Sequence, residues 1–267
     1  MKTLNYIDAH IHLADNGYAG KIDEVIRDAE QHHISQLLSN ATDYQSSRET
    51  IELAKRFPNR VLAAVGVHPF TATQSTTLNL DKLSELIDEN AKLIAAIGEV
   101  GLDGKYTKDE RLKTLQREAF QFCLELAEDK QLPVVVHSRQ ATSETLSCLA
   151  DYHLPGVLLH WYDGPLESLR LIKERKYFIS VGPALLYSHR TADIARASDP
   201  NIILTETDGP VRYRALFGEE LTKPSLVIAV TKKLAELRNA DLDTVRSTTI
   251  TNFQRFLSNR AHDINNQ

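Results

Sequence analysis

Six side chains of types that commonly bind metal ions occur at the ends of five short apolar segments in this 267-residue chain. The segments read YIDAHIH, LIAAIGEVGLD, LPVVVH, GVLLH and IILTETD. The six residues are His10, His12, Glu99, His137, His160 and Asp208. One His-x-His pair can be coincidence, but five apolar segments that each carry such a residue indicate one shared metal site.

Imidazole and carboxylate groups without thiolates suit two divalent cations such as zinc, magnesium or manganese. Alternate residues of a β-strand point to the same face, so the two histidines of the first segment can bind one ion together. A carboxylate can give one oxygen to each of two ions about 3.5–4 Å apart. The expected ligands are His10, His12 and Asp208 for one ion, His137 and His160 for the other, and Glu99 between them.

Such a site predicts hydrolysis. A divalent ion lowers the pKa of bound water from about 15.7 to about 7, and a second ion can polarise a phosphoryl oxygen. Asp208 can bind a metal and also accept the proton of that water, so Asp208 and Glu99 are the expected catalytic carboxylates. The pattern is typical of a metal-dependent hydrolase of ester bonds, most simply a two-metal phosphodiesterase.

The elements that must position these residues alternate between short apolar runs and longer amphipathic stretches. Eight strands are predicted, each followed by a helical pattern, which favours an α/β fold with a single (β/α)8 TIM barrel over residues 1–267. An open doubly wound sheet would gather its ligands at one switch point, whereas these come from widely separated strands. The predicted strands are Tyr6–Ile11, Gln36–Ala41, Val61–Val67, Leu93–Ile97, Pro133–Val136, Val157–Leu159, Tyr177–Val181 and Ile202–Thr205.

The composition is that of an ordinary globular protein, with 42% hydrophobic and 25% charged residues. A formal charge of −5 argues against binding nucleic acid through a large basic face, although bound cations would still attract phosphate locally. Cys123 and Cys148 fall in helical patterns, and we expect both to be small buried side chains without a disulfide.

The sequence predicts no membrane association. No apolar stretch approaches the roughly 18–20 residues that span a bilayer. A cleaved leader would remove part of the first ligand segment, so we expect a cytoplasmic protein. No obligate protein partner is evident, and a monomer is expected.

Eight short motifs spread over nearly the whole chain give it a resemblance to the TatD-type metal-dependent deoxyribonucleases, within the amidohydrolase-like barrels. Their order and approximate spacing also match that family. The motifs are DAHIHL at Asp8–Leu13, GVHP at Gly66–Pro69, GEVGLD at Gly98–Asp103, PVVVHSRQA at Pro133–Ala141, LHWYDG at Leu159–Gly164, TETDGP at Thr205–Pro210, KPS at Lys223–Ser225 and NFQRF at Asn252–Phe256.

The resemblance implies an enzyme that cleaves phosphodiester bonds in DNA, with the six ligands binding two metals. It further implies that Asp208 orients or deprotonates the attacking water, that His68 and Tyr106 line the site near the substrate, and that Arg139 contacts phosphate. Trp161 directly follows a ligand and could stack on a nucleobase.

Three positions depart from the family pattern. The family often has a second histidine directly after GVHP, where this chain has Phe70. It usually has an aromatic residue directly after GLD, whereas here Gly104 and Lys105 precede Tyr106. A Cys-Phe pair is common where this chain has Trp161 and Tyr162. None is a ligand, so the departures concern the choice of substrate.

Two other functions compete with the phosphodiesterase. An amidohydrolase-type enzyme would cleave a C–N or carboxylic ester bond of a small molecule, and several relatives with this barrel use a carboxylated lysine as the bridging ligand. Glu99 at that position favours the phosphoesterase branch. The remaining alternative, a metal-binding scaffold without catalysis, is disfavoured by the intact ligand set and by Asp208.

Overall fold

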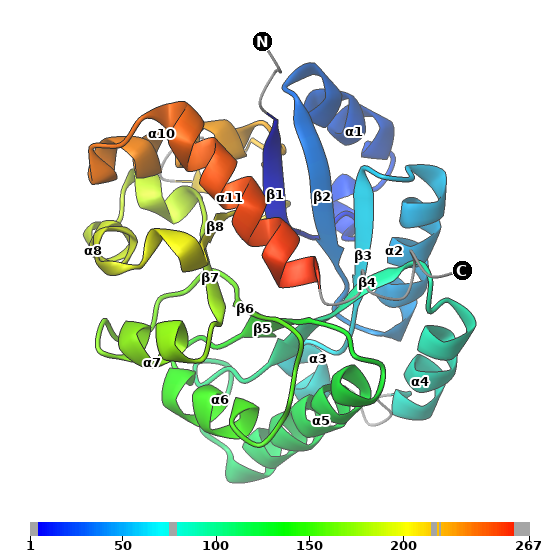
Figure 1. Ribbon diagram of the computed structural model, residues 1–267. Coiled ribbons are helices and arrows are strands. Elements are labelled where there is room, and N and C mark those ends of the chain that lie inside the picture. The colour runs from blue at the N-terminus through cyan, green and yellow to red at the C-terminus, as the bar shows by residue number, and fades with distance from the viewer. Residues whose placement is uncertain (1–4, 75–78, 215–217, 219, 259–267) are drawn as a thin grey trace.

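Eight parallel strands form one sheet in chain order, with each strand hydrogen-bonded to the next. In this computed structural model, which describes residues 5–74, 79–214, 218 and 220–258, helices surround the ring of strands (Figure 1). The strands are β1 (Tyr6–Ile11), β2 (Ile34–Asn40), β3 (Val61–Val65), β4 (Ile94–Gly101), β5 (Val134–His137), β6 (Val157–Leu159), β7 (Phe178–Val181) and β8 (Ile203–Thr205). The predicted (β/α)8 barrel is confirmed.

Helices fill the connections between strands and follow the last one. The α-helices are α1 (Ile22–Gln31), α2 (Tyr44–Arg56), α3 (Pro69–Gln74), α4 (Leu80–Glu89), α5 (Glu110–Asp129), α6 (Thr142–Leu149), α7 (Ser168–Glu174), α8 (His189–Ala197), α10 (Leu226–Arg238) and α11 (Leu242–Leu257). Short 3-10 turns are η1 (Asn16–Tyr18), η2 (Pro183–Leu186) and η3 (Pro200–Ile202). No helix in the described part of the chain is both long and apolar enough to cross a membrane.

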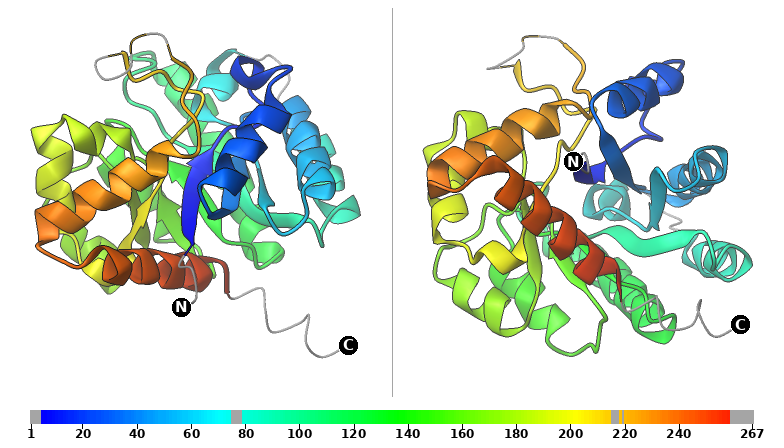
Figure 2. Two further views of the ribbon diagram at one scale, coloured as in Figure 1. Left: turned by 90° about the horizontal axis from the view of Figure 1, so that it is seen from above. Right: turned by 45° about the horizontal axis from the view of Figure 1, so that its top comes forward.

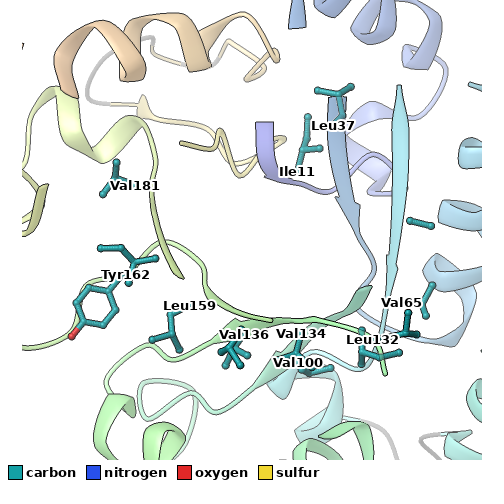
Figure 3. Packing of buried hydrophobic residues seen from close by; sticks show 14 of the residues in the cluster. Ile11, Leu37, Val65, Val100, Leu132, Val134, Val136, Leu159, Tyr162 and Val181 are labelled. Carbon is teal, nitrogen blue, oxygen red and sulfur yellow. The ribbon is translucent and has the colours of Figure 1, made fainter. Parts of the chain in front are cut away.

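Apolar side chains pack in two layers. One cluster takes side chains from all eight strands and from Phe253 and Phe256 of α11, and it fills the barrel interior. Helix α11 therefore lies across the end of the barrel where the strands begin (Figure 2). The other cluster lies between the strands and the surrounding helices, and Val134 and Val136 of β5 point into it (Figure 3). With one end covered by α11, a site can open only at the other end.

Strands β1 and β8 are joined where they end. The backbone N–H of Asp208 donates to the carbonyl of His10 at 2.9 Å, and that of His12 donates to the carbonyl of Gly209 at 2.7 Å. These bonds close the barrel between the first and last strands, and they involve three of the predicted ligand residues.

A buried carboxyl group adds a side-chain contact to the same closure. Both the hydroxyl and the backbone N–H of Thr207 donate to Asp8, which is fully buried on β1. Burial raises the pKa of Asp8 to about 8, against the opposing effect of these hydrogen bonds.

The predicted strand ends lie within two residues of the observed ones, except at β4. That strand was expected to stop at Ile97 but continues to Gly101, so Glu99 lies inside the strand. Its glycines hide the continuation, because they contribute no apolar pattern.

Cys123 is buried as expected, and burial raises the pKa of its thiol to about 12, whereas Cys148 is only half-buried.

Candidate metal centre

The structure brings all six predicted ligand residues together at the end of the barrel opposite α11. His10 lies in β1 and His12 directly after it, while His137 ends β5 and His160 follows β6. Glu99 lies near the end of β4, and Asp208 comes three residues after β8. The C-terminal ends of parallel barrel strands meet at one face, which is where enzymes of this fold place their sites.

Local irregularities in two strands turn the ligands inward. In β4, Ile97 and Val100 both pack in the outer cluster although they are three residues apart. The pairing of β4 with β5 shifts register between these two residues, so Glu99 points to the interior rather than to the side of Ile97. A similar shift between Asp8 and Ile11 of β1 turns the histidine pair inward.

One oxygen of Glu99 faces the first group of ligands. Its Oε2 lies 3.5 Å from Nε2 of His10 and 3.3 Å from Nε2 of His12. Oδ1 of Asp208 lies 3.4 and 3.2 Å from the same two nitrogens. The two imidazole nitrogens are themselves only 3.0 Å apart. Four donor atoms thus converge on one small volume, as a bound cation requires.

The other oxygen of Glu99 faces the second group. Its Oε1 lies 2.8 Å from Nδ1 of His137 and 2.7 Å from Nε2 of His160. These two nitrogens are 3.4 Å apart. The carboxylate therefore has one oxygen in each group, which is the arrangement that a bridge between two ions needs.

Hydrogen bonds on the far side of the rings show which nitrogens can bind metal. Nδ1 of His12 lies 2.9 Å from the carbonyl oxygen of Asn40, which can only accept, so Nδ1 carries the proton and Nε2 has a free lone pair. Nε2 of His137 lies 2.6 Å from Oδ2 of Asp103, which leaves Nδ1 as the nitrogen for a metal. The free lone pairs are those that face Glu99, so the residues present fit divalent cations.

A further histidine, His68, also reaches Glu99, with 3.4 Å between Nε2 and Oε1. Its Nδ1 accepts a hydrogen bond from the backbone N–H of Phe70 at 3.0 Å, so in the neutral ring Nε2 carries the proton. Burial lowers the pKa of His68, which favours that neutral form. His68 therefore presents a donor rather than a lone pair, which suits a substrate oxygen better than a metal.

Glu99 carries a negative charge at the middle of the centre. Burial acts to raise its pKa, but the nearby imidazoles, His160 and His68 foremost, outweigh burial and hold the pKa well below its usual range. For His10, burial is the main effect and lowers the pKa. Glu99 is consequently an anion surrounded by nitrogen donors.

A cavity of about 580 Å³ opens above these ligands. Its lining includes all four predicted substrate-contact residues, His68, Tyr106, Arg139 and Trp161. The guanidinium of Arg139 is held by Asp103, with Nε 2.7 Å from Oδ2, and it lies 4.6 Å from the centre of the Tyr106 ring. A larger groove of about 800 Å³ lies elsewhere, between η1 and helices α2 and α4.

Two buried carboxylates of the site were not foreseen from the sequence. Asp103 holds His137 and Arg139, and their hydrogen bonds lower its pKa to about 2 although burial opposes them. Glu206 accepts hydrogen bonds from the backbone of Trp161 and the hydroxyl of Ser180. Both lie in the short motifs GLD and TETD, so the sequence marks their positions but does not show which side chains they contact.

Comparison with known proteins places almost the whole chain in one family. Residues 7–258 match the family model described as TatD related DNase. An uncharacterized metal-dependent hydrolase of Methanocaldococcus jannaschii is 27% identical over 260 residues, which cover 97% of this chain and 100% of that protein. Deoxyribonuclease TATDN3 of Homo sapiens is 30% identical over 213 residues, which cover 76% of this chain and 77% of the relative.

Solved structures share the fold. The crystal structure of YjjV, a TatD homolog from Escherichia coli, superposes with a TM-score of 0.87 at 24% identity, covering 96% of this chain and 98% of the other. An uncharacterized amidohydrolase from Saccharomyces cerevisiae superposes with a TM-score of 0.80 at 19% identity, covering 95% and 100%. With the family model matching almost the whole described chain, this protein belongs to the TatD family of metal-dependent hydrolases.

Proposed function

We propose that this chain is a phosphodiesterase that hydrolyses DNA with the help of two divalent metal ions. The observation that carries the proposal is the placement of Glu99, because its two carboxylate oxygens face separate groups of ligand atoms. A single-ion site would not need a central carboxylate shared in this way. Phosphate ester hydrolysis is a reaction that such paired sites perform well, because charge develops on both the attacking and the leaving oxygen.

Six residues would hold the ions. When bound, the ions would supply a Lewis acid for a phosphoryl oxygen and would make a water molecule more acidic. The proposed ligands are His10, His12 and Asp208 in one group, His137 and His160 in the other, and Glu99 in both.

The remaining steps belong to side chains of the chain itself. Burial acts to raise the pKa of Asp208, but the neighbouring imidazoles of His12 and His10 outweigh it and lower the pKa. Asp208 is therefore an ionised carboxylate at neutral pH and can orient a water and accept its proton. The Nε2–H of His68 and the guanidinium of Arg139 line the same cavity and can donate to phosphate oxygens.

DNA is the proposed substrate for two reasons. One relative that covers most of the chain is named a deoxyribonuclease. The cavity also combines the metal ligands with Arg139, a residue type suited to phosphate through its two parallel donors. A neutral small-molecule amide or carboxylic ester would offer no anionic group to that guanidinium.

The test is metal reconstitution. Purified protein is stripped with a chelator, one divalent metal is restored at a time, and cleavage of end-labelled single-stranded DNA is followed on a gel. We expect metal-dependent cleavage, and we expect Asp208→Ala to reduce it by at least about a hundredfold, which also excludes a contaminating nuclease. Circular dichroism should show that this variant keeps its fold. If two ions bind per chain but no DNA is cleaved, the proposal fails and a C–N or carboxylic ester substrate takes its place.

A further inference from the structure

Two exposed aromatic rings lie together beside the candidate metal centre. Phe70, at the start of α3, is 46% exposed, and Tyr106, in the loop after β4, is 43% exposed. Their ring centres are 5.0 Å apart. Large aromatic side chains cost free energy when left in water, so an exposed pair next to a polar cavity needs an explanation.

The pair is connected to the centre at both residues. The backbone N–H of Phe70 fixes the ring of His68, whose Nε2 points at Glu99. Tyr106 lies 5.9 Å from the ring of His68 and 6.5 Å from that of His137, measured between ring centres. The rings therefore stand within the reach of one nucleotide whose phosphate occupies the centre.

We propose that Phe70 and Tyr106 form a stacking platform for a nucleobase of single-stranded DNA. This inference rests on the proposed function and adds to it how the enzyme holds its substrate. Every base has a π-face, so such a platform binds strands without reading their sequence. Arg139, which packs against Tyr106 and also lines the cavity, would bind the phosphate attached to the stacked nucleotide.

A nucleobase fits this platform better than an apolar protein segment would. Arg139, with its charge, lies directly beside the rings, and the cavity next to them is lined by histidines and carboxylates. A ligand here must combine a flat aromatic group with an anion a few ångströms away, and a nucleotide does so.

The experiment compares two fluorescein-labelled hexamers with identical phosphates. One is an oligothymidylate, and the other carries abasic tetrahydrofuran units in place of the nucleosides. Both strands have phosphorothioate linkages, which resist cleavage, and binding is measured by fluorescence anisotropy with zinc-loaded full-length protein. Phe70→Ala and Tyr106→Ala are each compared with the unmodified protein. The control is Leu171→Ala, which removes an apolar side chain of α7 that is 37% exposed and outside the cavity lining.

We expect the oligothymidylate to bind more tightly than the abasic strand. Each platform variant should weaken binding of the oligothymidylate about tenfold and leave binding of the abasic strand unchanged, whereas Leu171→Ala should change neither. Tyr106→Phe, which keeps the ring, should retain the base preference. If the protein without platform substitutions binds both strands equally well, the proposed stacking platform is wrong, but the proposed phosphodiesterase activity is unaffected. Failure to bind either strand would overturn both proposals.

Discussion

At the scale of single residues, Asp103 connects three parts of the site. Its Oδ2 contacts His137 at 2.6 Å and Arg139 at 2.7 Å, and its Oδ1 accepts from the backbone N–H groups of Lys105 and Tyr106. One carboxylate thus sets the orientation of a proposed metal ligand, a proposed phosphate contact and the loop that carries an aromatic ring. Carboxylates that fix a ligating histidine in this way tune metal affinity.

Asp103→Asn should weaken metal binding while the protein remains folded. The amide of asparagine can present an N–H₂ group where His137 and Arg139 both need an acceptor, so at least one donor loses its partner. We expect the affinity for divalent metal to fall by about tenfold to a hundredfold. Competition with a chromophoric chelator measures this directly. Arg139→Ala serves as the control, because it leaves the contact between Asp103 and His137 intact and should raise KM without changing metal affinity. If Asp103→Asn binds metal as tightly as the unmodified protein, Asp103 does not support metal binding through His137.

The six candidate ligands could be named from the sequence because each is a metal-binding residue type at the end of an apolar run. Asp103 and Glu206 could not, since they act through the orientation of another side chain, and no spacing rule encodes that contact. The orientation of the His68 ring depends in the same way on a contact that only the structure shows, the hydrogen bond from the backbone N–H of Phe70.

At the scale of elements, the number and order of the strands followed from alternating apolar and amphipathic segments. The face of β4 on which Glu99 lies could not be predicted in this way, because simple alternation places Glu99 on the same side as Ile97. The register shift between β4 and β5 reverses that side. Glycine lets the strand continue against β5 beyond the shift, since Gly101 has a φ of +140° and lies against the backbone of His137.

Gly101→Ala should therefore destabilise the barrel at β4. A Cβ at this position would clash with the carbonyl oxygen of His137, a contact that neither backbone can accept without moving. We expect the free energy of unfolding in urea to fall by about 3 kcal/mol or more. Gly182→Ala is the matched control, because its Cβ would meet no atom closer than 3.4 Å, and it should cost less than about 1 kcal/mol. Similar losses in the two variants would contradict this explanation of β4.

At the scale of the whole molecule, the two ends of the barrel differ in what covers them. Helix α11 crosses over the strands at the end where they begin (Figure 1), and its Phe253 and Phe256 pack in the interior cluster. The other end is polar, and the chain closes there through the bonds between β1 and β8. His10, His12 and Asp208 lie on the two sides of that closure, so an ion bound by them would join the first strand to the last.

Metal removal should consequently lower the thermal stability of the entire barrel. An ion present at about a hundred times its dissociation constant stabilises the folded state by about 2.7 kcal/mol, which corresponds to roughly 5–10 °C in Tm for a chain of this size. Differential scanning calorimetry of chelated and zinc-loaded protein measures the shift. Asp208→Ala removes the ligand that follows β8, so most of the zinc-dependent shift in Tm should disappear in this variant. If this variant gains as much from zinc as the unmodified protein does, the stabilising ion binds elsewhere and the closure does not depend on it.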